Sequence, residues 1–137
     1  MIHDLQGGAP RRLLSVPGKG RVYPDSWSQP ERIAISGWNE GVAVFDLNSP
    51  ANRLWPVENA DRTNRIRRFA ALSPDGNLIA YVSDEGAGQF QVLVEELEGN
   101  NRVQVPTDLG TEPLWCRNCE DLFFRVGNRV LASRITR

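Results

Sequence analysis

The chain has 137 residues, a formal net charge of −1 and a hydrophobic content of 40%. This length is enough for one domain with a hydrophobic core, and the balanced charge gives no reason to expect nucleic-acid binding. No apolar run reaches the roughly 18 residues of a membrane-spanning helix. Because the first residues also lack the pattern of a secretion signal, the sequence as written predicts a cytoplasmic protein. A longer parent chain would instead allow a periplasmic or extracytoplasmic location.

The predicted elements are all strands. In chain order, strand-like composition and alternation place them near 2–5, 11–15, 23–27, 32–36, 42–47, 53–56, 69–72, 78–83, 90–95, 102–106, 113–116, 121–126 and 129–134. No stretch of ten residues combines helical periodicity with helix caps. The fold class predicted from the sequence is therefore all-β.

Two patterns recur along the chain, the first of them at a nearly constant period. A bulky residue, a turn and an apolar strand recur at Trp27, Leu72 and Trp115, at spacings of 45 and 43 residues. Between these copies, an acidic residue with Leu, a short polar turn, and Arg with an aliphatic residue recur from Asp4, Asp46 and Glu96. Such a period with about four short strands is typical of a β-propeller blade.

We therefore expect a single partial β-propeller domain over 1–137, with blade pieces near 1–20, 21–62, 63–108 and 109–137. About three four-stranded blades make half of a six-bladed ring. The matching positions of Trp27 and Trp115, just before the turns, indicate residues that pack between blades.

Ser73-Pro74-Asp75-Gly76 fits the template of a type I turn, in which Ser, Pro and Gly favour the first, second and fourth places. We expect Ser73 to cap free backbone groups and Gly76 to adopt a conformation that a side chain would penalise. Gly127-Asn128 predicts a second hairpin turn. The first motif is thus a signature of the fold rather than a binding site.

The chain resembles the TolB-type, WD-like β-propeller repeats of bacteria over nearly its whole length. Three segments carry the resemblance: Leu72-Ser-Pro-Asp-Gly-Asn-Leu-Ile-Ala-Tyr-Val-Ser-Asp-Glu, Thr111-Glu-Pro-Leu-Trp and Glu120-Asp-Leu-Phe-Phe-Arg. The closest pattern is that of propellers C-terminal to bacterial serine/threonine protein kinases, although the kinase catalytic motifs do not occur here. The resemblance implies the fold but no single function, because such propellers serve many roles.

Catalysis is not expected. The only histidine, His3, lies near the N-terminus, and no Gly-x-Ser-x-Gly motif occurs. Cys116 and Cys119 form a Cys-x-x-Cys motif where another repeat has its turn, which favours a structural turn over a reversible redox pair or a metal site. We therefore predict no enzyme activity, cofactor or metal.

The innermost strand of each blade lines a propeller's channel. Tyr23, Arg68 and Glu112 are candidates for ligand or partner contacts at its mouth, against the alternative that they are ordinary rim residues. Trp38, in the segment 37–41, is a candidate for a surface contact.

A half-ring would expose a blade face at each end and unpaired strand edges, both of which favour association. We expect two copies to close one ring as a homodimer, with residues 11–15 of one copy completing residues 113–134 of the other. The predicted function is binding of a protein or small-molecule ligand, neither identified by the sequence. The alternatives are a detached sensor or scaffold segment of a bacterial kinase, a substrate-gating propeller of a peptidase, or a piece of a longer propeller.

Overall fold

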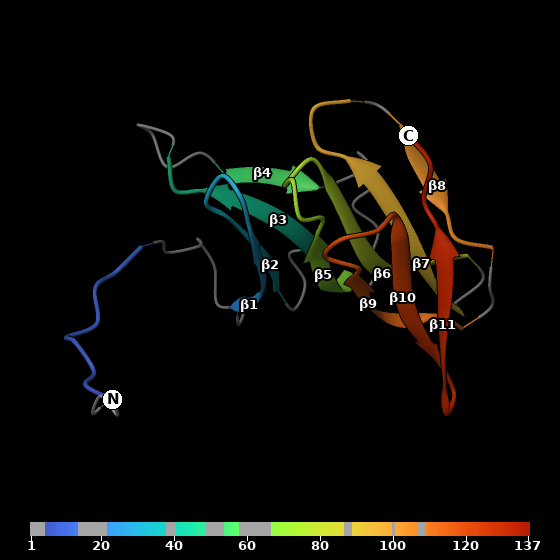
Figure 1. The fold of residues 1–137 in the computed structure, drawn as a ribbon, viewed down its shortest axis with the longest axis horizontal. Coiled ribbons are helices and arrows are strands. Elements are labelled where there is room, and N and C mark those ends of the chain that lie inside the picture. Colours follow the sequence, from blue (N-terminus) through green and yellow to red (C-terminus); the bar gives the residue numbers. More distant parts are fainter. Residues whose placement is uncertain are drawn as a thin grey trace.

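The computed structural model describes residues 5–13, 22–37, 41–48, 54–57, 67–86, 89–99, 101–106 and 109–137. These residues form eleven strands in three antiparallel sheets (Figure 1). The described segments contain no helix, and therefore no helix that could cross a membrane. The predicted all-β class is confirmed.

Each sheet pairs strands that are consecutive in the chain. Sheet 1 contains β1 (Val22–Ser28), β2 (Arg32–Gly37), β3 (Gly41–Asp46) and β4 (Leu54–Val57). Sheet 2 contains β5 (Arg67–Leu72), β6 (Leu78–Gly86), β7 (Gln89–Glu96) and β8 (Arg102–Gln104). Sheet 3 contains β9 (Thr111–Trp115), β10 (Asp121–Val126) and β11 (Arg129–Arg134). All eleven strands predicted after residue 20 are found, within a few residues at each end.

The two strands predicted before residue 20 are not found where the structure describes that segment. Residue 5 and residues 11–13 belong to no strand, and Leu5 and Leu13 are exposed. The rest of these two predicted strands lies outside the described residues. A strand is stable only beside a partner, and within the described part of the chain no strand pairs with residues 5–13.

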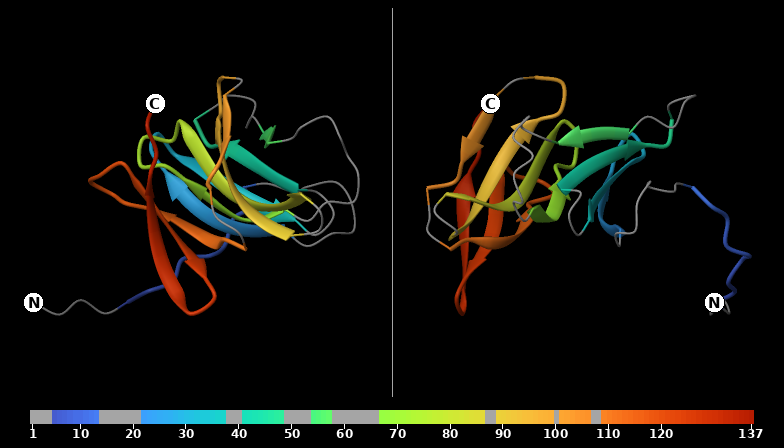
Figure 2. Two further views of the ribbon diagram at one scale, coloured as in Figure 1. Left: turned by 90° about the vertical axis from the view of Figure 1, so that its right-hand side faces the viewer. Right: turned by 180° about the vertical axis from the view of Figure 1, so that it is seen from behind.

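The three sheets are stacked, with sheet 2 between sheet 1 and sheet 3 (Figure 2). Alternate residues of sheet 2 point to opposite faces, as the two-residue period of a strand requires. Ile79, Tyr81 and Leu93 pack against sheet 1. Ala80 and Val92 pack against sheet 3. The hydrophobic core is therefore two layers, one on each side of sheet 2.

Side chains of β1 bind the backbone of β5 across the first layer. Phe69 has a left-handed φ of 55°, and the pairing of β5 with β6 is irregular there. The N–H of the next residue, Ala70, donates to the Asp25 carboxylate at 3.0 Å, and the Leu72 N–H donates to the Ser26 hydroxyl at 2.9 Å. In sheet 3 the position of Ala70 is taken by Pro113, which has no N–H to satisfy.

The turn between β5 and β6 has the predicted form. The Gly76 N–H donates to the Ser73 carbonyl at 2.8 Å, and the Ser73 hydroxyl accepts from the Leu78 N–H at 3.0 Å. Gly76 has a φ of +75°, and Gly127, in the other predicted hairpin, has a φ of +59°. Both conformations favour glycine.

Gly76→Ala is expected to destabilise the fold more than Gly127→Ala. A Cβ at Gly76 would lie 2.1 Å from the Gln29 carbonyl oxygen, whereas a Cβ at Gly127 would meet nothing within 4 Å. Both changes carry the cost of a left-handed alanine, about 1–2 kcal/mol, and only Gly76→Ala adds a clash with backbone. Urea unfolding of the two variants measures the difference, and equal losses would contradict this account of the turn.

Candidate functional site

The face of each sheet turned toward the next sheet carries an equivalent valine in its third strand. In each sheet, the second-strand residue that pairs with Val42, Val92 or Val130 also pairs with the first strand, at a place before the irregular pairing of that first strand. The three valines therefore occupy equivalent positions. Val42 is 1% exposed under sheet 2, and Val92 is fully buried under sheet 3. Val130 is 76% exposed. The next sheet covers this face in sheets 1 and 2, whereas the equivalent face of sheet 3 is exposed.

Other apolar side chains surround Val130 on the same face. The register pairs Phe123 with both Leu114 and Ala132, so these three side chains share one side of sheet 3 with Val130. Leu114 and Ala132 are exposed and Phe123 is partly exposed. We call these four residues the open face of sheet 3. A contiguous apolar patch of this kind is typical of an interaction surface.

Each first strand has a bulky residue at or next to its end, on the face that is turned toward the preceding sheet. Leu72 is buried against sheet 1, and the indole N–H of Trp115 donates to the Ala71 carbonyl of sheet 2 at 2.8 Å. The packing role predicted for Trp115 is thus confirmed. Trp27, the equivalent residue of sheet 1, is 58% exposed.

The packing role predicted for Trp27 is wrong within the single chain, because no described sheet precedes sheet 1. Ile33, which pairs with Trp27, is partly exposed. Ile35 and Phe45 are buried on the same face, and Phe45 lies directly opposite Ile33, so this face is open only around Trp27 and Ile33. We call Trp27 and Ile33 the open face of sheet 1.

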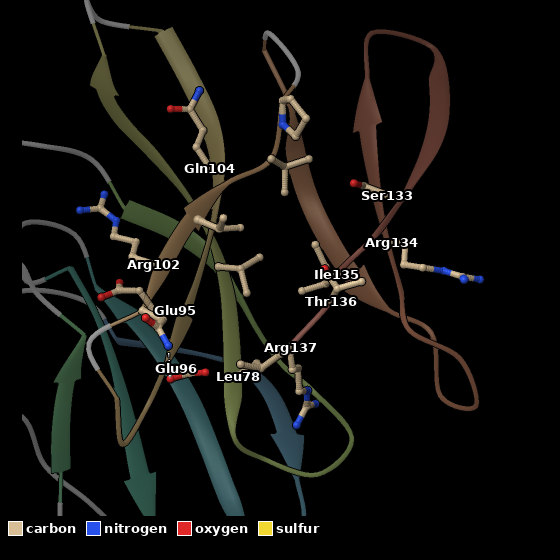
Figure 3. Close-up of a pocket in the computed structure, with 15 residues that line it drawn as sticks. Leu78, Glu95, Glu96, Arg102, Gln104, Ser133, Arg134, Ile135, Thr136 and Arg137 are labelled. Atoms are coloured by element: carbon tan, nitrogen blue, oxygen red, sulfur yellow. Dashed lines mark hydrogen bonds between the residues drawn. The ribbon is translucent and has the colours of Figure 1, made fainter.

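An open groove of about 530 Å³ lies between sheet 2 and the end of the chain (Figure 3). Figure 3 shows Glu95, Glu96, Arg102 and Gln104 on one side and Ser133, Arg134, Ile135 and Thr136 on the other. The groove also has apolar lining residues, which are Leu78, Val94, Val103, Val105 and Pro106. It lies where β11 has no fourth strand beside it, unlike β3 and β7. A groove with this lining fits an extended segment that has both apolar and charged side chains.

The residues predicted at a channel mouth do not occupy one repeated position. Tyr23 and Arg68 are equivalent by register, but the third equivalent is Thr111 rather than Glu112. Glu112 instead matches Phe69, and both have a left-handed φ, 54° and 55°. Thr111 lies four residues before Trp115, as Tyr23 and Arg68 do before Trp27 and Leu72, so the repeat spacing also indicates this equivalence.

The surroundings of these residues also differ. Tyr23 is exposed, and the side chain of Arg68 lies outside the described part. Glu112 forms an exposed ion pair with Arg125, with 2.7 Å between Nε and Oε2. The hydrogen bond from Arg125 lowers the pKa of Glu112 below its ordinary value. A mouth role for Tyr23, Arg68 and Glu112 stays a prediction.

Cys116 and Cys119 form a disulfide across the turn between β9 and β10. The Cys116 N–H donates to the Asp121 carbonyl at 3.0 Å, which matches the bond from Ser73 N–H to the Leu78 carbonyl in sheet 2. The turn is therefore equivalent to Ser73–Gly76, as the structural interpretation predicts, whereas that interpretation does not include the disulfide. In this oxidised form the pair offers no thiolate to a metal, and a redox role stays a prediction.

Trp38, the candidate for a surface contact, lies outside the described residues, and so does His3, the only histidine. Among the residues that the structure describes, no three His, Cys, Asp or Glu side chains are grouped so that they could hold a metal ion. The surfaces that remain as candidate sites are the two open faces, the groove and the edge of β11.

Asp75 connects the turn of sheet 2 to the end of the chain. Its carboxylate accepts a hydrogen bond from Arg137 and also from the Ser73 hydroxyl and the Asn77 N–H. The bond from Arg137 is the largest cause that holds the pKa of Asp75 well below its ordinary value, against a smaller opposing effect of burial. Asp75 is thereby charged at any pH near neutrality.

Asp75→Asn is expected to make the free energy of unfolding depend less on pH between pH 5 and pH 3. A carboxyl group whose pKa is lowered by folding stabilises the protein above its unfolded pKa, about 4, and loses this contribution as the pH falls toward the folded pKa. The effect is below about 1 kcal/mol, because both partners are partly exposed to solvent. Urea unfolding at pH 5 and pH 3 measures it, and Arg137→Gln should remove most of the same difference. An unchanged difference in both variants would contradict the role of the pair.

Comparison with known proteins adds no family or relative to these observations. No family model matches the chain, and no curated protein matches its sequence. The candidate surfaces are therefore interpreted from their own geometry.

Proposed function

We propose that the chain is a non-enzymatic β-propeller module that binds other proteins, and that its first partner is a second copy of itself. The carrying observation is that the open faces of sheet 3 and sheet 1 are the two halves of an interface that the chain builds twice internally. Val42 and Val92 form one half of that internal interface, and Leu72 and Trp115 form the other half. Exposed Val130 and Trp27 occupy the same two positions.

Each open face fits the other better than it fits itself. The internal layers pair the third strand of one sheet with the first strand of the next sheet, so the expected contact joins the Val130 side of one copy to the Trp27 side of the other. Two copies placed head to tail make two equivalent contacts and close a ring of six sheets. Six sheets lie within the range of known propellers, which have about four to eight blades.

The ring would bind further proteins or ligands through its faces and its channel mouth, where Tyr23, Arg68 and Glu112 are the candidate contacts. The repeated order of antiparallel sheets, two with four strands and one with three, supports this assignment. So does the resemblance of residues 72–85 to TolB-type repeats.

Light scattering behind a sizing column, over a range of concentrations, tests the proposal. A dimer that dissociates on dilution supports closure of one ring. A monomer at every concentration overturns the proposal. A mass that keeps growing with concentration overturns the ring, because head-to-tail contacts whose rotation does not close produce open filaments.

A further inference from the structure

We propose that β11 receives a fourth strand from a second copy, namely the segment that contains Arg11, Arg12 and Leu13. The inference rests on the proposed dimer and adds a second contact to it, in which an extended segment pairs with the edge of a sheet. It concerns the edge of sheet 3 and the groove beside it, whereas the dimer itself rests on the open faces.

The backbone of β11 has one free side among the described residues. The Ile135 N–H donates to the Glu120 carbonyl, and Val126 pairs with Arg129 at the two-residue turn. Neighbouring residues of an antiparallel strand alternate in the side to which their N–H and C=O groups point. The odd-numbered residues of β11 therefore bind β10, and the even-numbered residues direct their backbone groups to the free edge: Val130, Ala132 and Arg134. An unpaired edge of this kind is a template for another strand.

The segment at residues 11–13 has the sequence of the missing strand. Arg12-Leu13 follows an acidic residue, Leu and a polar stretch, as Arg53-Leu54 does before β4 and as Arg102-Val103 does in β8. Residues 11–13 belong to no strand, unlike Leu54, Arg102 and Val103, and they are exposed. They precede sheet 1, at the opposite end of the stack from β11 (Figure 1), so the donor has to be another copy.

The two consecutive leucines that follow the arginines fit the groove in either of two pairing registers. In sheet 2 Arg102 lies opposite Glu95, whereas in sheet 1 Leu54 lies opposite Phe45, the equivalent of Glu95. The two registers thus differ by one residue, which exchanges the faces of every side chain. Because Leu13 and Leu14 are consecutive, either register places one leucine toward the apolar lining of the groove and the other toward the open face of sheet 3.

Amide hydrogen exchange measured by NMR tests the donated strand. In the dimer, the N–H groups of Val130, Ala132 and Arg134 are expected to exchange roughly tenfold more slowly, or slower still, than in the dilute monomer. The double variant Leu13→Pro/Leu14→Pro removes a backbone donor in either register, so this protection should be lost. The matched control Gly7→Pro/Gly8→Pro changes two exposed residues outside the pairing segment and should keep it.

The outcomes separate this inference from the dimer. If the wild-type dimer leaves these three amides unprotected, or if the Leu13→Pro/Leu14→Pro variant keeps their protection, strand donation is overturned while the dimer stands. If the wild-type chain is a monomer at every concentration, both proposals fail. Protection that is lost only in the Leu13→Pro/Leu14→Pro variant supports donation.

Discussion

Replacing Val130 with aspartate is expected to weaken association of two copies by about 100-fold or more, because burial of a carboxylate adds to the loss of an apolar contact. In the single chain Val130 is mostly exposed, so its stability should change by less than about 0.5 kcal/mol. In the ring it would take the place of the buried Val42 and Val92. Sedimentation equilibrium gives the dissociation constant, and urea unfolding at a concentration where the chain is monomeric gives the stability.

Leu109→Asp is the matched control for this experiment. Leu109 is also an exposed hydrophobic residue, but it lies in the connection between β8 and β9 and not on an open face. It should leave the dissociation constant within about threefold of wild type. If Val130→Asp dimerises as tightly as Leu109→Asp, the open face of sheet 3 is not the contact.

Mixing two defective variants tests the head-to-tail direction of the contact. Trp27→Ser should weaken association from the other side, so neither it nor Val130→Asp dimerises well alone. In a mixed pair, one contact carries both changes and the other carries neither, so the mixture should associate more tightly than either variant. A contact of the Val130 face with itself would give no such rescue.

The strands and turns could be predicted because their signals are local. Ser73-Pro74-Asp75-Gly76 specifies its turn through its own backbone preferences, and the alternation of Phe90, Val92 and Val94 indicates a strand whatever packs against it. The exposure of Trp27 could not be predicted in this way. Trp27 and Trp115 look alike in the sequence, but the burial of each depends on whether another sheet precedes its own.

The predicted channel mouth includes one residue that is displaced by one position. Tyr23 and Arg68 lie four residues before Trp27 and Leu72, whereas Glu112 lies three residues before Trp115, so the repeat spacing itself indicates Thr111. The groove has no sequence signal of its own, since it exists where β11 lacks a neighbour. What the sequence does show is the pair Arg12-Leu13, which repeats the start of an outer strand.

Leu122→Ala is expected to destabilise the single chain by about 3 kcal/mol, within the usual range of about 2–5 kcal/mol for a buried leucine. Leu122 is fully buried between sheet 2 and sheet 3, in the same cluster as Ala80 and Val92. Its removal leaves a cavity in the layer that holds sheet 3 on the stack. Urea unfolding followed by tryptophan fluorescence measures the loss, because Trp115 packs against the same cluster.

Leu114→Ala is the matched control, because it makes the same chemical change on the opposite face of the same sheet. Leu114 is exposed, so its loss should cost the single chain less than about 0.5 kcal/mol. In the dimer it should cost more, since its open face would be covered. Leu122 is therefore expected to govern folding, and Leu114 is expected to govern association. If Leu114→Ala destabilised the dilute monomer as much as Leu122→Ala, the outer face of sheet 3 would already be covered within one chain, and no second copy would be needed.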